Sequence, residues 1–477
     1  MGPHRRRSLV VPTRSDDLLA TMVEPVGGPL GKRTAPGEVT PGFFTVERVL
    51  ILMTAVAATL AVVLKGHCRT SGWVTPDQYS TVCFSVFPNS FTEDKLGALF
   101  PFLSVGSPFD ESILAGWIAG ITAWIVQWIS PGENAQLAFF DVNAALIAVL
   151  WLITVVVAAR TAGRRSWDAG MVACSPVLIL TAYVSWDFWA VALVGGALFL
   201  FARNMILAAG VLLGAAAMAA PYPFFILLVL LLLGIRVGRI TKILELLAAA
   251  LVTWLLILLP VMLFNPQGFP AYLVTLMAAE PTESSLYGGY NLVAARLGWA
   301  SMDVAVANVL MSLLISILIF GLAALAFYAH RPPRVGQLLF VAVGAFMLLN
   351  KGYEPWHAMW LLPLVVMAMP RWRPVLLWQA AIVTHFIALM LFRSKVLGNL
   401  ENQHAIDTPY FLMAALISAF ATCAMIGLVI RDIYVPKYDV VLRGNSVDPH
   451  AGVLATGLGQ QAVLDGEKAG RQIQSHG

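Results

Sequence analysis

Residues 46–64 read VERVLILMTAVAATLAVVL, and a polar stretch of more than forty residues, Gly66–Ser112, follows them. An apolar run of this length forms a helix that crosses the hydrocarbon core of a bilayer, which is about 30 Å thick. The polar stretch carries five carboxylates: Asp77, Glu93, Asp94, Asp110 and Glu111. The sequence therefore opens with a membrane span followed by a long loop in which chemistry in water is feasible.

The composition extends this conclusion to the whole chain. Hydrophobic residues make up 59% of the 477 residues and charged residues 12%, whereas about a quarter of a soluble domain is charged. A membrane β-barrel would show alternating segments of about ten residues, which are missing from the sequence pattern. The net charge of +4 is small, and the basic residues lie in short loops between apolar runs. We therefore expect an all-α, multi-pass membrane protein with lipid as a partner and no nucleic acid.

Thirteen apolar segments are visible, and the basic loops give their orientation. The segments are 46–65, 113–130, 137–159, 169–185, 188–203, 204–220, 221–235, 243–264, 303–328, 336–351, 355–370, 375–393 and 409–431. Loops rich in Arg and Lys favour the cytoplasmic side, and all of them fall on one side if 113–130, with its three tryptophans, does not cross. The prediction is about twelve transmembrane helices in the plasma membrane, with both termini cytoplasmic.

This topology divides the chain into three parts. Residues 1–45 and 433–477 are predicted to be cytoplasmic tails, the first disordered and the second largely so. Residues 46–432 form the transmembrane domain, with a first outer loop at 66–112 and a second long outer loop at 265–302. Most polar residues of chemical interest then lie on the outer face.

The four cysteines separate into two kinds. Cys68 and Cys83 share the first loop, where either a disulfide or two free thiols is possible, and an oxidising compartment would favour the disulfide. Cys174 and Cys423 lie in apolar runs and are expected to be small core residues.

Two aspartates stand at the edges of apolar runs. Asp187 follows Ser185 and Trp186, and a carboxylate there is costly unless it is paired or faces a wet cavity. It is either a contact for a sugar hydroxyl or a cation, or a helix cap at a tight turn. Asp141 raises the same question, and there the cap is favoured.

The segment Asn350–His357 combines basic, aromatic and histidine side chains between two apolar runs. Lys351 is predicted to bind a phosphate, and His357 to supply a donor or an acid–base group. Tyr353 and Trp356 offer flat faces to a sugar or a lipid. The alternative is interfacial anchoring, in which Lys extends to the headgroups and Trp lies among them. His385, within a later run, is expected to be a satisfied interior histidine.

The remaining polar features are less specific. Loop 265–302 contains Glu280 among carboxylates, hydroxyls and aromatics that suit a carbohydrate but also suit any solvated loop. No phosphate loop, dinucleotide fingerprint, zinc spacing or serine elbow occurs in the sequence. We therefore expect no cofactor, and a divalent metal is not expected either.

These elements together resemble a known family. Over residues 45–432 the chain is similar to GT-C membrane glycosyltransferases, specifically the actinobacterial branch of glycosyltransferase family 87, the polyprenyl-phosphate-mannose-dependent type. The matching pieces are Cys83-Phe84-Ser85, Ser112–Gly116, Phe139–Asn143, Ser175–Asp187, Tyr222-Pro223, Asn350-Lys351 and Pro355–Leu364.

The resemblance implies transfer of a sugar (mannose or a pentose) from a polyprenyl phosphate to an envelope glycan or glycolipid on the outer face. A carboxylate in the first outer loop would be the general base, and Lys351, Asp187 and Tyr222 would contact substrate. Relatives tend to carry Asp where this chain has Val86. The catalytic base expected in its place is Asp94 or Glu93, and Asp110 or Glu111 would serve if the loop folds back.

Two other functions stay open on the sequence. Val86, and Ala220-Pro221 where relatives often have a basic residue, would fit a non-catalytic relative that binds a lipid-linked sugar or a partner protein. A transporter would also have twelve spans, but its polar groups usually lie near the midplane between two related halves. No internal repeat is visible in the sequence.

Overall fold

The computed structural model describes residues 45–130, 132, 134–398, 405–442 and 448–455. The predicted tail at 1–44 and the end of the chain at 456–477 lie outside the described residues. Within the described ranges every regular element is helical, and no β-strand is present. Apolar surroundings explain this, because each backbone N–H and C=O must find its partner inside the chain.

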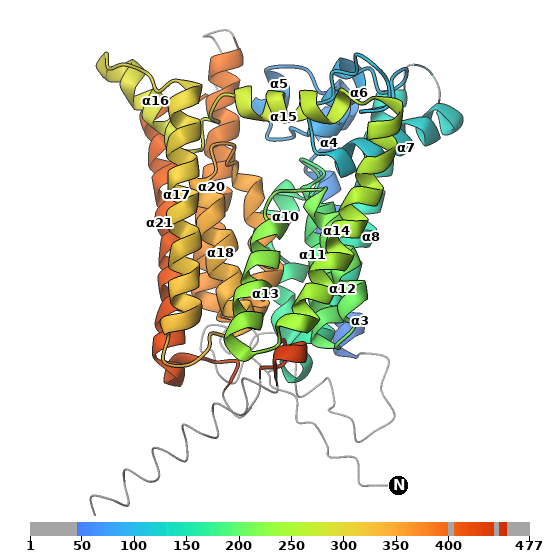
Figure 1. The fold of residues 1–477 in the computed structure, drawn as a ribbon. Helices are drawn as coiled ribbons and strands as arrows, with labels where there is room; N and C mark the ends of the chain where they lie inside the picture. The colour runs from blue at the N-terminus through green and yellow to red at the C-terminus, as the bar shows by residue number, and fades with distance from the viewer. Residues whose placement is uncertain (1–44, 131, 133, 399–404, 443–447, 456–477) are drawn as a thin grey trace, which may run out of the picture.

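Six helices are long and apolar enough to cross a membrane, and they make the chain a polytopic membrane protein. They are α3 (Val46–Val63), α8 (Ala135–Ala162), α14 (Ile240–Phe264), α17 (Val304–Tyr328), α20 (Trp372–Leu397) and α21 (Thr408–Tyr434). They run along one common direction in Figure 1. The start of α3 and the end of α21 lie at the same end of the bundle in Figure 1, and we call it the tail end.

Shorter helices fill the interior of the bundle. They are α10 (Pro176–Thr181), α11 (Asp187–Ala202), α12 (Ile206–Ala217), α13 (Pro223–Val237), α18 (Val335–Leu349), η4 (Pro355–Leu361) and α19 (Leu362–Ala368). The longest of them has 16 residues, or about 24 Å at 1.5 Å per residue. The chain therefore turns within the bundle, and three of its turns bring polar residues there: Ala182–Trp186, Met218–Tyr222 and Asn350–Glu354.

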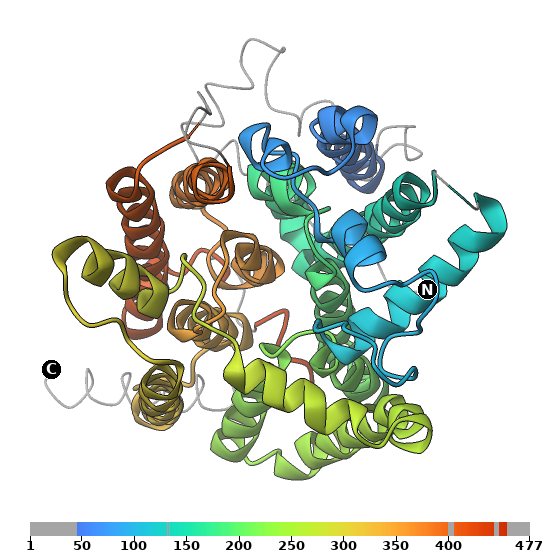
Figure 2. The same ribbon diagram turned by 90° about the horizontal axis from the view of Figure 1, so that it is seen from above.

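The opposite end, which we call the loop end, is covered by helices that lie across the bundle axis. Figures 1 and 2 show α7 (Ile113–Ile129) and α15 (Gly268–Ala278) in this orientation, with α4 (Gly66–Ser71), α5 (Asp77–Ser80), α6 (Val86–Glu93) and α16 (Leu286–Leu297) beside them. The transverse α7 agrees with the prediction that 113–130 does not cross. The predicted loop 265–302 is mostly helical, because its apolar residues allow α15 to lie over the bundle.

The helices α12 and α14 pack backbone to backbone. A Cβ atom added at Gly210 would lie 2.4 Å from the Leu246 carbonyl oxygen, and one added at Gly214 would lie 2.2 Å from that of Ala250. Small residues four positions apart allow this close approach. Such packing matters in a bilayer, because the hydrophobic effect does not drive helices together there. The contact fixes α12, and with it the Met218–Tyr222 turn that follows.

Two short parts of the predicted tail at 433–477, residues 433–442 and 448–455, lie within the described ranges and pack on the bundle. Asp439, Asp448 and His450 are buried, although a largely disordered tail was expected. Arg334 explains the difference, because its guanidinium donates to Asp439 at 2.6 and 3.0 Å and to the carbonyl oxygens of Met367 and Ala368. A buried Arg needs such partners, so the segment after α21 folds back over the bundle.

The cysteine predictions meet different outcomes. Cys68 and Cys83 form a disulfide with 5.9 Å between their Cα atoms, which confirms the pairing. Cys174 and Cys423 are exposed and not in the core, because the surface of a membrane bundle is itself apolar. The cap expected at Asp141 is also wrong: Asp141 lies inside α8 and pairs with Arg69 of the first loop.

We predict that the double variant Cys68→Ser, Cys83→Ser loses stability. The bridge closes a loop of 15 residues, for which the chain-entropy model gives about 3 kcal/mol. Thermal unfolding of the purified protein, followed by tryptophan fluorescence, should show a lower midpoint. The matched control Cys174→Ser, Cys423→Ser should unfold like the wild type, and equal midpoints for all three proteins would contradict the prediction.

Candidate functional site

The carboxylate of Asp187 is the centre of the polar network inside the bundle. Its Oδ2 accepts a hydrogen bond from the Ser185 hydroxyl at 2.6 Å, and its Oδ1 accepts one from the Trp360 indole at 3.2 Å. The side chain is 15% exposed. Asp187 is the first residue of α11 but makes no capping bond, so it joins two segments that are far apart in sequence.

His357 lies against this carboxylate. Its Nδ1 accepts a hydrogen bond from the Glu354 backbone N–H at 3.1 Å, and its Nε2 lies 3.8 Å from Asp187 Oδ2. Because Nδ1 accepts, the proton of the neutral ring is on Nε2 and faces Asp187. The ring stacks on Trp360 with 4.3 Å between centroids. The turn at Glu354 thus fixes both the tautomer and the orientation of His357.

The Tyr222 ring also stacks on Trp360. Its ring lies 4.8 Å from Trp360 at an interplanar angle of 22°. The Tyr222 hydroxyl is buried and has no hydrogen-bond partner among the described residues. Three of the residues predicted to bind substrate, Asp187, His357 and Tyr222, therefore meet around Trp360.

The first loop packs on the turn that carries Asp187. The Val86 N–H donates to the Val184 carbonyl at 2.8 Å, and the Ser85 hydroxyl donates to the Tyr183 carbonyl at 2.8 Å. The Lys65 ammonium is buried and donates to the carbonyl of Phe84 at 2.8 Å. Val86, where relatives in the GT-C family that the chain resembles tend to carry Asp, therefore lies next to the turn of Asp187 and offers no carboxylate there.

A group of carboxylates from the same loop lies near Asp187. Loss of hydration, with a smaller contribution from the charges of Asp187, Asp110 and Asp94, raises the pKa of the Glu111 carboxyl to about 8. Loss of hydration also raises the pKa of Asp94, with contributions from Asp110 and Glu93. The N–H of Leu114, just after Glu111, donates to the carbonyl of Met218 and holds this group against the turn of Tyr222. The loop does fold back.

A second cluster lies around Arg393 at the loop end of α20. One of its terminal nitrogens donates to Glu283 at 2.8 Å and to Glu354 at 2.5 Å. The guanidinium also lies over the Trp356 ring at 6.0 Å, and Trp356 contacts Phe84 of the first loop with 6.2 Å between centroids. Glu354 thus connects this cluster to His357.

The structure gives other predicted residues different surroundings. The Lys351 ammonium is buried and donates to the carbonyls of Met277 and Ala279 at 2.9 and 2.8 Å, so it caps the end of α15, and its phosphate-binding role stays a prediction. Glu280 is exposed beside it.

Three further residues have other environments. Glu93 is exposed at the end of α6. The Tyr353 ring lies 6.3 Å from His357 and 6.1 Å from His385. His385 is buried, and neither ring nitrogen has a partner among the described residues, which corrects the expectation of a satisfied histidine.

Sequence reasoning did not identify Arg393, Trp360 and Lys65 as site residues. A usable signal existed for Arg393: it ends an apolar run on the side where the charge rule makes cations rare. Trp360 was visible only as part of a motif, and Lys65 only as the end of a span. Their roles come from partners far away in the sequence, such as Asp187 for Trp360.

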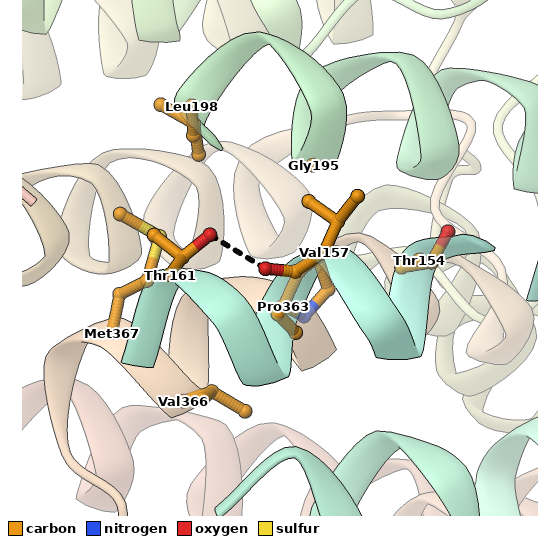
Figure 3. Close-up of a pocket in the computed structure, with 9 residues that line it drawn as sticks. Thr154, Val157, Thr161, Gly195, Leu198, Pro363, Val366 and Met367 are labelled. Carbon is orange, nitrogen blue, oxygen red and sulfur yellow. Dashed lines mark hydrogen bonds between the residues drawn. The ribbon is translucent and has the colours of Figure 1, made fainter. Parts of the chain in front are cut away.

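Two other features of the bundle do not belong to this site. A small apolar pocket lies between α8, α11 and α19, where Thr154, Val157, Gly195, Leu198 and Pro363 are among the lining residues (Figure 3). Its lining contains no charged group. Across the described ranges no group of three His, Cys, Asp or Glu side chains is arranged to hold a metal ion.

No protein-family model matches this sequence, and no curated protein or solved structure matches it either.

We predict that Glu111 makes stability depend on pH. A carboxyl whose pKa is raised on folding binds its proton more tightly in the folded chain. Its contribution is complete below about pH 4.5 and is lost as the pH rises to about 8. Between these values the wild type should lose at least about 1.4 kcal/mol more than Glu111→Gln, which is the equivalent of one pKa unit. Unfolding midpoints that change in parallel for the two proteins would refute the assignment.

Proposed function

We propose that this protein is a membrane glycosyltransferase that moves a sugar, mannose or a pentose, from a polyprenyl phosphate to a hydroxyl of an envelope glycan or glycolipid. The observation that carries the proposal is the group of Glu111, Asp94 and Asp110 beside Asp187 and His357. Carboxyl groups with different proton affinities suit acid–base chemistry on a sugar hydroxyl. The aromatic faces suit the sugar ring, and the apolar bundle suits the lipid that carries it.

The path of the chain supports the family resemblance. If the short interior helices α10 to α13, α18 and α19 are counted with the six long ones, the chain makes twelve passes along the bundle. An even number agrees with Figure 1, where the start of α3 and the end of α21 lie at the same end of the bundle. We propose that the tail end is cytoplasmic, that the membrane is the plasma membrane and that transfer takes place at the loop end, where the Cys68–Cys83 disulfide fits an oxidising compartment.

The proposed chemistry needs one proton transfer and one leaving group. The acceptor oxygen forms a bond to the anomeric carbon, the bond from that carbon to the phosphate oxygen breaks, and the lipid phosphate leaves as an anion. The hydroxyl proton passes to Glu111, because a base works best when its pKa is near the working pH. Asp94 is the second candidate base. Arg393 would bind the phosphate by releasing Glu283 or Glu354, since Arg recognises phosphate through paired donors.

The second candidate function is a non-catalytic relative that binds a lipid-linked sugar. Two residues favour it. Val86 has no carboxylate to act as a base, and the Lys351 ammonium is hydrogen-bonded to backbone carbonyls. This form would keep the aromatic stack of Tyr222, Trp360 and His357 as a binding surface.

We predict that Glu111→Gln lowers transfer at least about a hundredfold, the usual contribution of general base catalysis. Membranes containing the full chain would be given lipid-linked, radiolabelled mannose or pentose, and incorporation into envelope material would be counted. Asp77→Asn is the matched control, because this exposed carboxylate of the same loop pairs with His67, away from Asp187. The wild-type rate should also rise with pH up to about 8, as Glu111 loses its proton.

Different results separate the two functions. Loss of transfer in Asp94→Asn but not in Glu111→Gln would move the role of base to Asp94. If no donor supports transfer while the lipid-linked sugar still binds, and Trp360→Ala removes that binding, the non-catalytic function is correct. Absence of both transfer and binding would refute the family resemblance.

A further inference from the structure

A basic pocket lies at the tail end, between the ends of α17 and α21. It is lined by His330, Arg331, Ile433, Tyr434 and Pro436. Its volume is about 230 Å³, which is enough for a phosphate with a small organic group. It belongs to neither polar cluster at the loop end, and the proposed transfer chemistry does not use it.

The basic side chains of this pocket, His330 and Arg331, have no partners among the described residues. Neither His330 nor Arg331 makes a hydrogen bond or ion pair with any described residue, and both are exposed. The nearby carboxylates are already occupied: Asp432 binds Arg371 and Arg431, and Asp439 binds Arg334. Asp448 also lies near Arg334 and contacts His450. An anion in the pocket would therefore meet unpaired positive charge.

The segment that closes the pocket adds to this charge. Lys437 follows Pro436 directly, and its ammonium lies 5.0 Å from the ring of Tyr438, over which Arg431 also lies. Arg331, Arg334, Arg371, Arg431 and Lys437 outnumber the three carboxylates Asp432, Asp439 and Asp448 by two. Cations near the C-terminal end of a helix interact favourably with the helix dipole, which is an alternative reason for their position. Here, however, two such helix ends line one cavity, which can hold a ligand.

The surroundings of the pocket identify the source of the anion. Apolar side chains along both helices are exposed, including Leu313, Ile317 and Phe320 of α17 and Met413, Leu416 and Phe420 of α21. In a membrane these faces contact acyl chains. The exposed rings of Tyr328, Tyr434 and Tyr438 lie at the same end, where aromatic residues meet headgroups. An anion here would therefore be attached to a lipid.

We propose that this pocket binds the phosphate-bearing headgroup of an anionic membrane lipid, with Arg331 as its main ligand and His330 as a second donor. The acyl chains would lie along α17 and α21. Basic pockets between helices on the cytoplasmic side are known to hold such headgroups. The site is independent of the transfer reaction proposed above.

The test uses the full chain, purified in a neutral detergent and titrated with phosphatidylglycerol or phosphatidylcholine, with bound lipid counted by native mass spectrometry. The wild type should prefer phosphatidylglycerol. Arg331→Gln should weaken its binding about fivefold, the effect of one surface cation on an anionic lipid. Arg331→Lys, which keeps the charge, should bind nearly as the wild type does.

The control is Arg203→Gln, which removes another tail-end cation outside the pocket and should leave binding unchanged. Equal losses in Arg203→Gln and Arg331→Gln would show a diffuse charge effect and overturn the site. Competition by millimolar inorganic phosphate that removes all bound phosphatidylglycerol would show a free-phosphate site and overturn the lipid assignment. Unchanged preference in the double variant His330→Gln, Arg331→Gln would also overturn it.

Discussion

The hydrogen bonds that the protein donates to the carboxylate of Asp187, in place of water, organise the interior of this bundle. Asp187 lies between apolar helices, where an ion without donors is costly. Ser185 supplies one donor from the same turn and Trp360 supplies another from η4. Because Trp360 also stacks on His357 and Tyr222, this single requirement joins three interior turns. The first loop then docks on the turn of Asp187 through the backbone of Val86.

The same carboxylate creates the chemical asymmetry of the site. Loss of water raises the pKa of the Glu111 carboxyl, and the charge of Asp187 adds to the effect. Two acidic groups close together thus acquire different roles from their surroundings alone, a pattern that recurs in enzymes. Glu354 contributes to the other side, because it joins Arg393 through its side chain and His357 through its backbone.

The sequence predicted what depends on local pattern and missed what depends on distant partners. Apolar runs predicted helices, and the shared loop position left the Cys68–Cys83 disulfide open against two free thiols. Asp187, His357 and Tyr222 were expected on the outer face, and they meet around Trp360 inside the bundle. Lys351 was expected to be free, because the carbonyls it caps lie more than seventy residues away. The buried tail segment was missed for the same reason. Asp439 is typical of an exposed residue in the sequence, and its burial depends on Arg334, which is distant in the chain.

The two ends of the bundle carry different kinds of charge, and this difference constrains function. At the tail end, cations outnumber carboxylates around Arg334 and Arg371, as expected where a membrane protein faces anionic lipid. At the loop end the carboxylates of the first loop dominate, and the buried Lys65 and Lys351 are tied to backbone carbonyls. Arg393 differs from these two lysines, since its charge is shared between two side chains, Glu283 and Glu354. A cation held by side chains can exchange one of them for a ligand oxygen, whereas a cation that caps a helix end cannot leave without disturbing the fold. Arg393 is therefore better placed than Lys65 or Lys351 to bind a ligand.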